Sequence, residues 1–183
     1  MKTSKLIASV AFAFMMLVSF NSNAQKFSGL DKSPMDAASY PSDYKVSDKA
    51  IKVVYSRPQL KGRSIDKLAP KGKVWRLGAN EAAELHVYKD MTLNGEKVNE
   101  GTYTLYAMPG DGEWTVIVSE DLNVWGSYFY KEENDVARIT VPVTEDSESL
   151  EAFSMAFTES EDGVHLHMGW GTARVAVPFV LAK

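Results

Sequence analysis

The sequence contains no cysteine. Disulfide bonds, thiolate metal ligands and catalysis by a thiol are therefore excluded. A lipid anchor that requires a cysteine at a cleavage point is excluded for the same reason. If the protein is exported, its stability must come from the packing of its core.

The sequence also lacks an apolar run long enough to span a membrane. The mostly apolar segment at residues 6–20 is shorter than the roughly 18–20 residues that a membrane helix requires. Lys2 and Lys5 precede this segment, and Ser22-Asn23-Ala24 follows it. This order is typical of a signal peptide. We expect residues 1–24 to be removed and the remaining chain to be periplasmic or secreted, without stable membrane insertion.

Positive charge is scarce beyond residue 24. Eighteen Lys and Arg residues stand against 24 Asp and Glu residues, a net charge of −6. Nucleic acids bind basic surfaces, so we predict no nucleic-acid partner. A P-loop, a dinucleotide fingerprint and a G-x-S-x-G nucleophile motif are also missing. The sequence therefore indicates no cofactor, and it leaves open whether the protein is an enzyme.

Apolar residues alternate with polar ones from residue 51 onward, which predicts strands with one buried face. Such segments lie at residues 51–55, 82–88, 102–107, 113–119, 138–143, 153–157, 164–170 and 175–179. Turn sequences join several of them, namely Asn94-Gly95, Pro109-Gly110-Asp111-Gly112 and Glu161-Asp162-Gly163. We predict an all-β domain over residues 50–183, a single antiparallel β-sandwich or jelly-roll-like fold, preceded by an N-terminal arm or linker at residues 25–49.

Helix is expected only as short turns around residues 64–68 and 130–134. Pro142 and Pro178 fall within the strand pattern. Because proline cannot donate a hydrogen bond to a neighbouring strand, we expect both on edge strands or at strand ends.

One long connection, residues 55–82, is named here the basic loop. It carries seven Lys and Arg residues against two acidic ones, and apolar residues such as Trp75 and Leu77 anchor it. Connections of this length are usually functional when they are ordered. Arginine binds carboxylate or phosphate through two parallel hydrogen bonds, so the loop is a candidate anion site. In the alternative, the arginines bind backbone carbonyls and acidic side chains, and hold the loop in place.

Four motifs follow one another in the basic loop: Tyr55-Ser56-Arg57-Pro58, Lys61-Gly62-Arg63, Gly72-Lys73-Val74-Trp75-Arg76 and Gly78-Ala79-Asn80-Glu81-Ala82. In this order they resemble the domain-of-unknown-function 2911 family of exported bacterial proteins, which is common in Bacteroidetes-type bacteria. The resemblance extends from residue 51 to the C-terminus and implies an exported single domain, but no particular activity. The matching positions are our candidate ligand-binding residues: Arg57, Lys61, Arg63, Trp75, Arg76, Asn80 and Glu81.

Three functions remain open at this point. In the leading hypothesis, the protein is a binding module for an anionic or carbohydrate-like small molecule, which the arginines contact and Asn80 and Glu81 orient. In the second, it is a hydrolase of envelope or glycan material with Glu81 as the candidate catalytic base, with or without a metal ion. In the third, the domain is structural and has no ligand.

The three histidines are the remaining candidates for a metal site. His86 follows Glu84 by two residues, and His165 and His167 have the same spacing, so that each pair shares one face of its strand. If the two strands were neighbours, these side chains could hold a divalent ion. Both pairs face away from the apolar side, where a solvated surface is expected, so we predict no metal site.

A second region of interest is residues 124–130, named here the aromatic segment. Its aromatic residues are Trp125, Tyr128, Phe129 and Tyr130, which could form a stacking surface for a sugar or another ring. Large aromatic residues are mostly buried, so we expect Trp125 in the core and the two tyrosines nearer to solvent. Trp114 and Trp170 lie on apolar strand faces and are predicted core residues.

Overall fold

The computed structural model describes residues 25–182, and the expected signal peptide lies outside them. The chain divides into two units, residues 1–30 and residues 31–183. Residues 25–30 contain no helix or strand. The second unit begins before residue 50, because residues 31–49 include a strand that pairs with the rest of the sheet.

The second unit is an antiparallel all-β domain, as the sequence predicts. Its strands are β1 (Met35–Tyr40), β2 (Ile51–Ser56), β3 (Ala83–Val87), β4 (Met91–Leu93), β5 (Glu96–Val98), β6 (Gly101–Pro109), β7 (Glu113–Ser119), β8 (Asp135–Ser160) and β9 (Gly163–Leu181). They form one sheet in the order β1-β2-β3-β6-β7-β8-β9-β4-β5. The all-β class is therefore confirmed, whereas the sandwich or jelly-roll arrangement is not, because the strands of residues 25–182 form one continuous sheet.

Helix is limited to α2 (Ile65–Leu68) and the 3-10 turn η1 (Glu132–Asn134) in the described part of the chain. The Ser64 hydroxyl caps α2 by accepting a hydrogen bond from the Lys67 backbone N–H at 3.3 Å. Among residues 25–182, no helix is long and apolar enough to cross a membrane.

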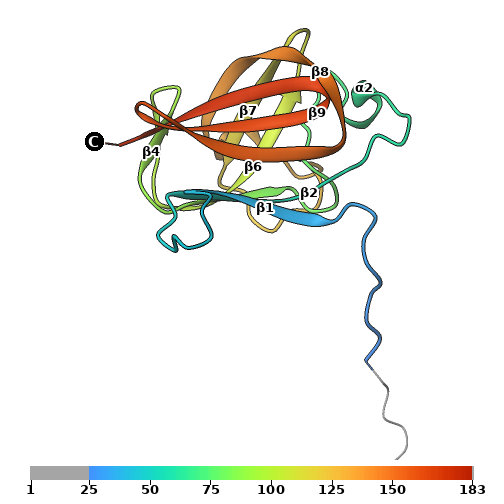
Figure 1. The fold of residues 1–183 in the computed structure, drawn as a ribbon, viewed down its shortest axis with the longest axis horizontal. Coiled ribbons are helices and arrows are strands. Elements are labelled where there is room, and N and C mark those ends of the chain that lie inside the picture. Colours follow the sequence, from blue (N-terminus) through green and yellow to red (C-terminus); the bar gives the residue numbers. More distant parts are fainter. Residues whose placement is uncertain (1–24, 183) are drawn as a thin grey trace, which may run out of the picture. The chain divides into compact units, whose positions relative to one another are not determined.

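The sheet bends over itself, so that β8 and β9 lie above β1 and β2 (Figure 1). Tyr55 of β2 connects the two layers. Its hydroxyl accepts a hydrogen bond from the backbone N–H of Met155 at 2.7 Å, and its ring centre lies 5.8 Å from that of Phe153. The apolar faces of both layers therefore share one core.

Four aromatic side chains form the centre of this core. The Trp75 ring stacks on Trp170 at 5.4 Å between ring centres, and contacts Phe153 at 5.0 Å and Trp114 at 5.8 Å. All four side chains are buried, which confirms the prediction for Trp114 and Trp170. Backbone hydrogen bonds between Trp75 and Ala107 of β6, at 2.7 and 2.9 Å, hold the basic loop against the sheet.

The predicted turns are confirmed. Asn94 and Gly95 join β4 to β5 with φ angles of 53° and 83°, the left-handed backbone that this two-residue turn requires. Pro142 and Pro178 lie within long strands and not on the sheet edges, which β1 and β5 form. Pro142 is the last residue of β8 that pairs with β7, and the next residue, Val143, pairs with β9. The N–H that proline lacks therefore falls at the position where β8 changes from one partner strand to the other.

The aromatic centre of the core generates a stability prediction. Replacing Trp75 by Ala should lower the free energy of unfolding by about 3–5 kcal/mol, because it leaves a cavity between three rings. The measurement is urea denaturation followed by circular dichroism. The control is Tyr44→Ala, which removes an aromatic ring that is 88% exposed and should change stability by less than about 0.5 kcal/mol. Equal losses in the two variants would contradict the central position of Trp75.

Candidate functional site

Arg57, the first arginine of the basic loop, is fully engaged within the protein. Its Nε donates to the Phe153 carbonyl at 3.0 Å, and its Nη2 donates to the Ser154 hydroxyl at 2.6 Å. Its Nη1 forms a salt bridge with Asp36 of β1 at 3.0 Å. The guanidinium therefore links β1, the end of β2 and β8, which is the structural role in the alternative stated above.

Arg63 is held by contacts within its own loop, and the backbone of Lys61 is held by β8. The Arg63 guanidinium donates to the carbonyls of Leu60 at 2.9 Å and Gln59 at 2.7 Å, which both belong to its own loop. Lys61 is exposed and has a left-handed backbone with φ of 48°. Its backbone N–H donates to the Glu151 carboxylate at 2.7 Å.

Arg76 and Trp75 occupy the inner part of the basic loop. The Arg76 Nε is buried and has no hydrogen-bond partner among residues 25–182. Trp75 is a core residue, as described above, and its Nε1 donates to the Gly78 carbonyl at 3.2 Å. Trp75 therefore offers no face for a ligand, and the arginines do not converge on one open pocket.

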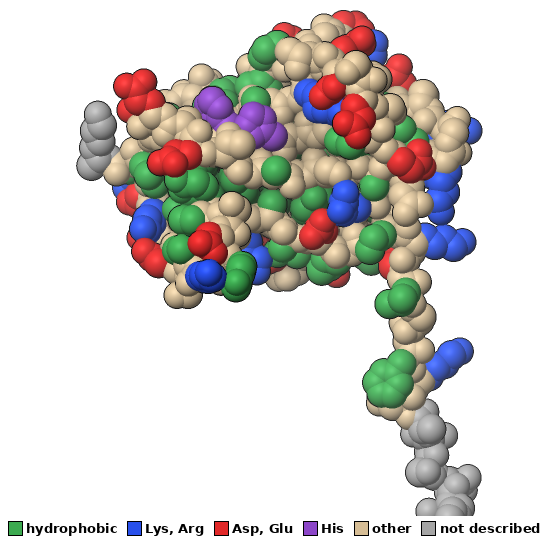
Figure 2. All heavy atoms as spheres, viewed as in Figure 1, with side chains coloured by type: hydrophobic (Ala, Val, Ile, Leu, Met, Phe, Trp, Pro, Cys, Tyr) green, Lys and Arg blue, Asp and Glu red, His purple; other side chains and the backbone are tan. Residues whose placement is uncertain are grey.

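The three histidines are distributed over two strands that are not neighbours. His86 lies on β3, whereas His165 and His167 lie on β9 with 6.0 Å between their ring centres. In the sheet order, β3 and β9 are not adjacent. Histidine side chains are visible at the surface that β8 and β9 form (Figure 2). The His86 Nε2 is 2.7 Å from a Glu84 oxygen. In the described residues no three His, Cys, Asp or Glu side chains are placed to hold a metal ion.

The end of the basic loop pairs with the aromatic segment, and this pairing creates an exposed candidate site. The Asn80 carbonyl accepts a hydrogen bond from the Gly126 N–H, and the Val124 carbonyl accepts one from the Ala82 N–H, both at 3.0 Å. Between these bonds, Glu81 lies directly opposite Trp125. The Ser127 hydroxyl adds a bond to the Val74 carbonyl at 2.8 Å.

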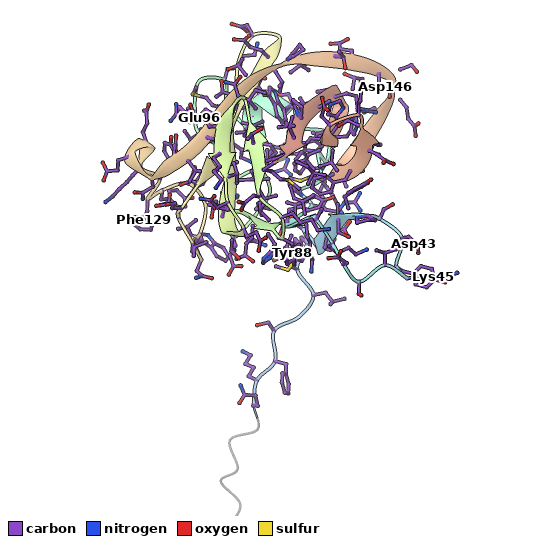
Figure 3. The ribbon with its side chains drawn as sticks, turned by 90° about the vertical axis from the view of Figure 1, so that its left-hand side faces the viewer. Asp43, Lys45, Tyr88, Glu96, Phe129 and Asp146 are labelled. Carbon is purple, nitrogen blue, oxygen red and sulfur yellow. The ribbon has the colours of Figure 1, made fainter. Side chains whose placement is uncertain are left out.

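The structure corrects the expectation that Trp125 belongs to the core. Its side chain is 57% exposed, and Tyr128 and Phe129 are exposed by 76% and 74%. Figure 3 shows Phe129 at the edge of the molecule, pointing away from the sheet. The reason is that the aromatic segment pairs with the basic loop and not with the apolar face of a strand, so that no layer covers Trp125.

A small pocket lies beside this aromatic surface, with a volume of about 200 Å³. Its lining includes Ser56 of β2, Glu81, Glu84 of β3, Thr104 of β6 and Asn123. Two of its polar groups are therefore carboxylates, and two are hydroxyls from β2 and β6, the strands on either side of β3. Sequence reasoning selected Glu81 as a site residue but could not place the others beside it, because the strand order that brings them together is not visible in the sequence.

The backbone around the pocket includes unusual conformations. Leu77, Asn80 and Asn123 have positive φ angles of 51°, 62° and 55°. Asparagine tolerates this region, but a bulky residue such as Leu77 adopts it only where the surroundings enforce it. Here the Leu77 side chain is completely buried. The burial of Leu77 thus fixes the path of the basic loop just before Asn80 and Glu81.

A polar network on the outer face of the sheet fixes the aromatic segment from its other end. The Tyr130 hydroxyl donates to the Asp135 carboxylate at 2.8 Å and accepts a hydrogen bond from Arg138. Burial and the neighbouring Asp135 raise the pKa of Tyr130 to about 12, so its hydroxyl stays protonated at neutral pH. The Tyr130 ring packs on that of Tyr106 at 5.1 Å. Tyr130 is therefore an anchor, whereas Tyr128 is free to contact a ligand.

The contacts of the arginines generate a prediction that compares two of them. Arg57→Ala should lower the free energy of unfolding by about 1–3 kcal/mol, since it removes bonds that join three strands. Arg63→Ala is the matched control. It removes only bonds within an exposed loop, so we expect a change below about 0.5 kcal/mol. Chemical denaturation measures both values, and equal losses would contradict the linking role of Arg57.

Comparison with known proteins gives one match. A family model described as "Protein of unknown function (DUF2911)" matches residues 33–179. No curated protein and no solved structure matches the chain. The matched range begins just before β1 and ends within β9, so that it includes the sheet, the basic loop and the aromatic segment. The chain belongs to the DUF2911 family.

Proposed function

We propose that the protein is an exported binding module for an uncharged carbohydrate. The ligand site consists of the exposed rings of the aromatic segment and the polar pocket beside them. The observation that carries the proposal is the pairing of Glu81 with the exposed Trp125. Residues directly opposite each other in an antiparallel pair project to the same side, so a carboxylate and an indole face solvent together.

This pair suits the two kinds of surface that a sugar presents. The apolar C–H face of a pyranose packs on an aromatic ring, and its hydroxyl groups donate hydrogen bonds to a carboxylate. Tyr128 and Phe129 extend the aromatic surface. Asn123 and Thr104 supply further polar groups in the pocket. Of the two ligand classes in the leading hypothesis, these groups support the carbohydrate.

The charges favour a neutral ligand over an anionic one. Arg57 and Arg63 already donate hydrogen bonds from their guanidinium groups within the protein, which leaves fewer donors for a carboxylate or phosphate. Glu81 and Glu84 both line the pocket, so an anionic group there would meet two carboxylates. Export to the periplasm or beyond, which the first 24 residues predict, would bring the protein into contact with glycans.

Glycan binding can be tested directly. Isothermal titration calorimetry with neutral oligosaccharides (cello-, xylo-, manno- and chito-oligomers) and with an acidic one (oligogalacturonate) should give binding only for a neutral series. Trp125→Ala should weaken that binding about tenfold or more, ~1.4 kcal/mol. The control is Tyr44→Ala, an exposed aromatic residue outside the site, which should bind as the wild type does. Absence of binding to every neutral series, or preferred binding of oligogalacturonate, would reject the proposal.

A hydrolase is the second candidate, because two carboxylates line one pocket. Paired carboxylates are the usual groups of glycoside hydrolysis. In this version Glu81 is the base, and Glu81→Gln should abolish release of reducing ends from a neutral glycan that the wild type cleaves. Thr140→Ala, a change at an exposed position of β8 outside the pocket, is the control. Binding without cleavage in the wild type would leave the binding module as the function.

A further inference from the structure

A larger hollow than the pocket of Glu81 lies in another part of the domain, between the two halves of β9. Its volume is about 480 Å³, which is within the range of pockets for small molecules. Most of its lining is apolar and comes from both long strands: Pro142, Leu150, Met155, Ala156, Met168, Val175 and Ala176. The cleft shares no residue with the pocket of Glu81. Asp146, which pairs with Arg174 of the cleft, and Phe129 of the aromatic segment lie on opposite sides of the molecule (Figure 3).

The cleft exists because β9 bends and β8 bulges. Gly171 has a φ of 55°, and beyond it the chain returns toward the start of the strand. The ends of the two halves meet, since the Leu181 N–H donates to the Asp162 carbonyl at 2.9 Å. The cleft lies between the bend and the two ends. His167 and Gly169 of the first half of β9 line one side of it, and Val175 and Ala176 of the second half line the other.

The bulge of β8 covers one end of the cleft. The β8–β9 register shifts on both sides of Leu150, where β8 takes more residues than β9 to cover the same distance. A Cβ atom at Gly169 would lie 2.8 Å from the Leu150 Cδ1 and 3.3 Å from the Arg174 Cδ. The glycine therefore lets these two side chains close over the strand and form the wall.

The single cation at the cleft is already neutralised and bonded. The Arg174 Nη1 donates to the carbonyls of Gly171 at 2.9 Å and Ala173 at 3.0 Å, and its Nη2 donates to that of Glu148 at 2.6 Å. Its Nε is 3.3 Å from the Asp146 carboxylate. Four of the five N–H groups of the guanidinium are thus directed to partners within the protein, which leaves little for an anionic ligand.

His167 is the polar group that remains available. Its Nε2 and the Thr158 hydroxyl are 2.8 Å apart. Burial and the neighbouring His165 lower the pKa of His167, so that the imidazole is neutral at pH 7. The other ring nitrogen has no hydrogen-bond partner among residues 25–182.

From this geometry we infer that the cleft binds an uncharged, mainly apolar small molecule whose one polar group bonds to His167. A fatty alcohol or an alkylphenol has this chemistry. Its chain would contact Pro142, Ala156 and Ala176, which are exposed lining residues, and its hydroxyl would lie at the imidazole. A fatty acid has the same chain but carries a carboxylate, which the bonded Arg174 cannot neutralise.

Displacement of a fluorescent probe tests the inference. N-phenyl-1-naphthylamine, which is uncharged and apolar, should fluoresce more strongly with the wild-type protein, and 1-decanol should displace it at a concentration at least about tenfold lower than decanoate at pH 7.5. Ala156→Trp and Ala176→Trp place an indole in the cleft from exposed positions and should abolish the probe signal. Val180→Trp, at an exposed position of β9 outside the lining, is the matched control and should leave the signal unchanged.

Each outcome is decisive once circular dichroism shows that the variants are folded. No probe signal, an unchanged signal in both cleft variants, or stronger displacement by decanoate would overturn the inference. His167→Phe keeps a ring in place and should raise the concentration of 1-decanol needed to displace the probe about tenfold. An unchanged concentration would show that the histidine does not contact the ligand. Trp125→Ala should leave probe binding intact, so that failure of the carbohydrate proposal and failure of this one can be told apart.

Discussion

The burial of Trp75 among Trp114, Phe153 and Trp170 determines how the rest of the domain can be arranged. The four rings come from the basic loop, β7, β8 and β9. Each ring contributes a large apolar surface, and rings in edge-to-face or offset contact gain additional energy. Because one of them belongs to the loop, a long connection with only one short helix becomes an integral part of the core.

The fixed loop explains the position of the candidate carbohydrate site. Leu77, two residues after Trp75, is also buried and adopts a left-handed backbone. The chain then turns outward, and its pairing with the aromatic segment places Glu81 opposite Trp125. The site is therefore exposed while its supports are buried. This division is expected of a binding surface, since rigid neighbours reduce the entropy that a ligand would otherwise have to overcome.

The basic residues that distinguish the loop in the sequence act mainly within the protein. Arg57 bonds to β1 and β8, Arg63 bonds to its own loop, and Lys71 forms an exposed ion pair with Asp111. Charge concentration alone therefore did not identify the candidate ligand surface. A basic segment in an acidic chain can equally supply donors for carbonyl and carboxylate groups that the fold leaves without partners.

The sequence by itself determined most strands after residue 50, the turns and the membership of Trp114 and Trp170 in the core, because alternation and turn residues act over short distances. It did not indicate β1, which lies in the segment expected to be an arm or linker. It did not determine the strand order, and therefore could not show that β3 and β9 are separated or that Ser56, Glu84 and Thr104 meet at one pocket. The position of Trp125 also depended on tertiary structure. An indole beside a glycine is compatible with core or surface, and only the pairing of its backbone with the basic loop left it uncovered. The cleft also depended on tertiary structure, since it forms where the bend at Gly171 and the shifted β8–β9 register bring the two halves of β9 together.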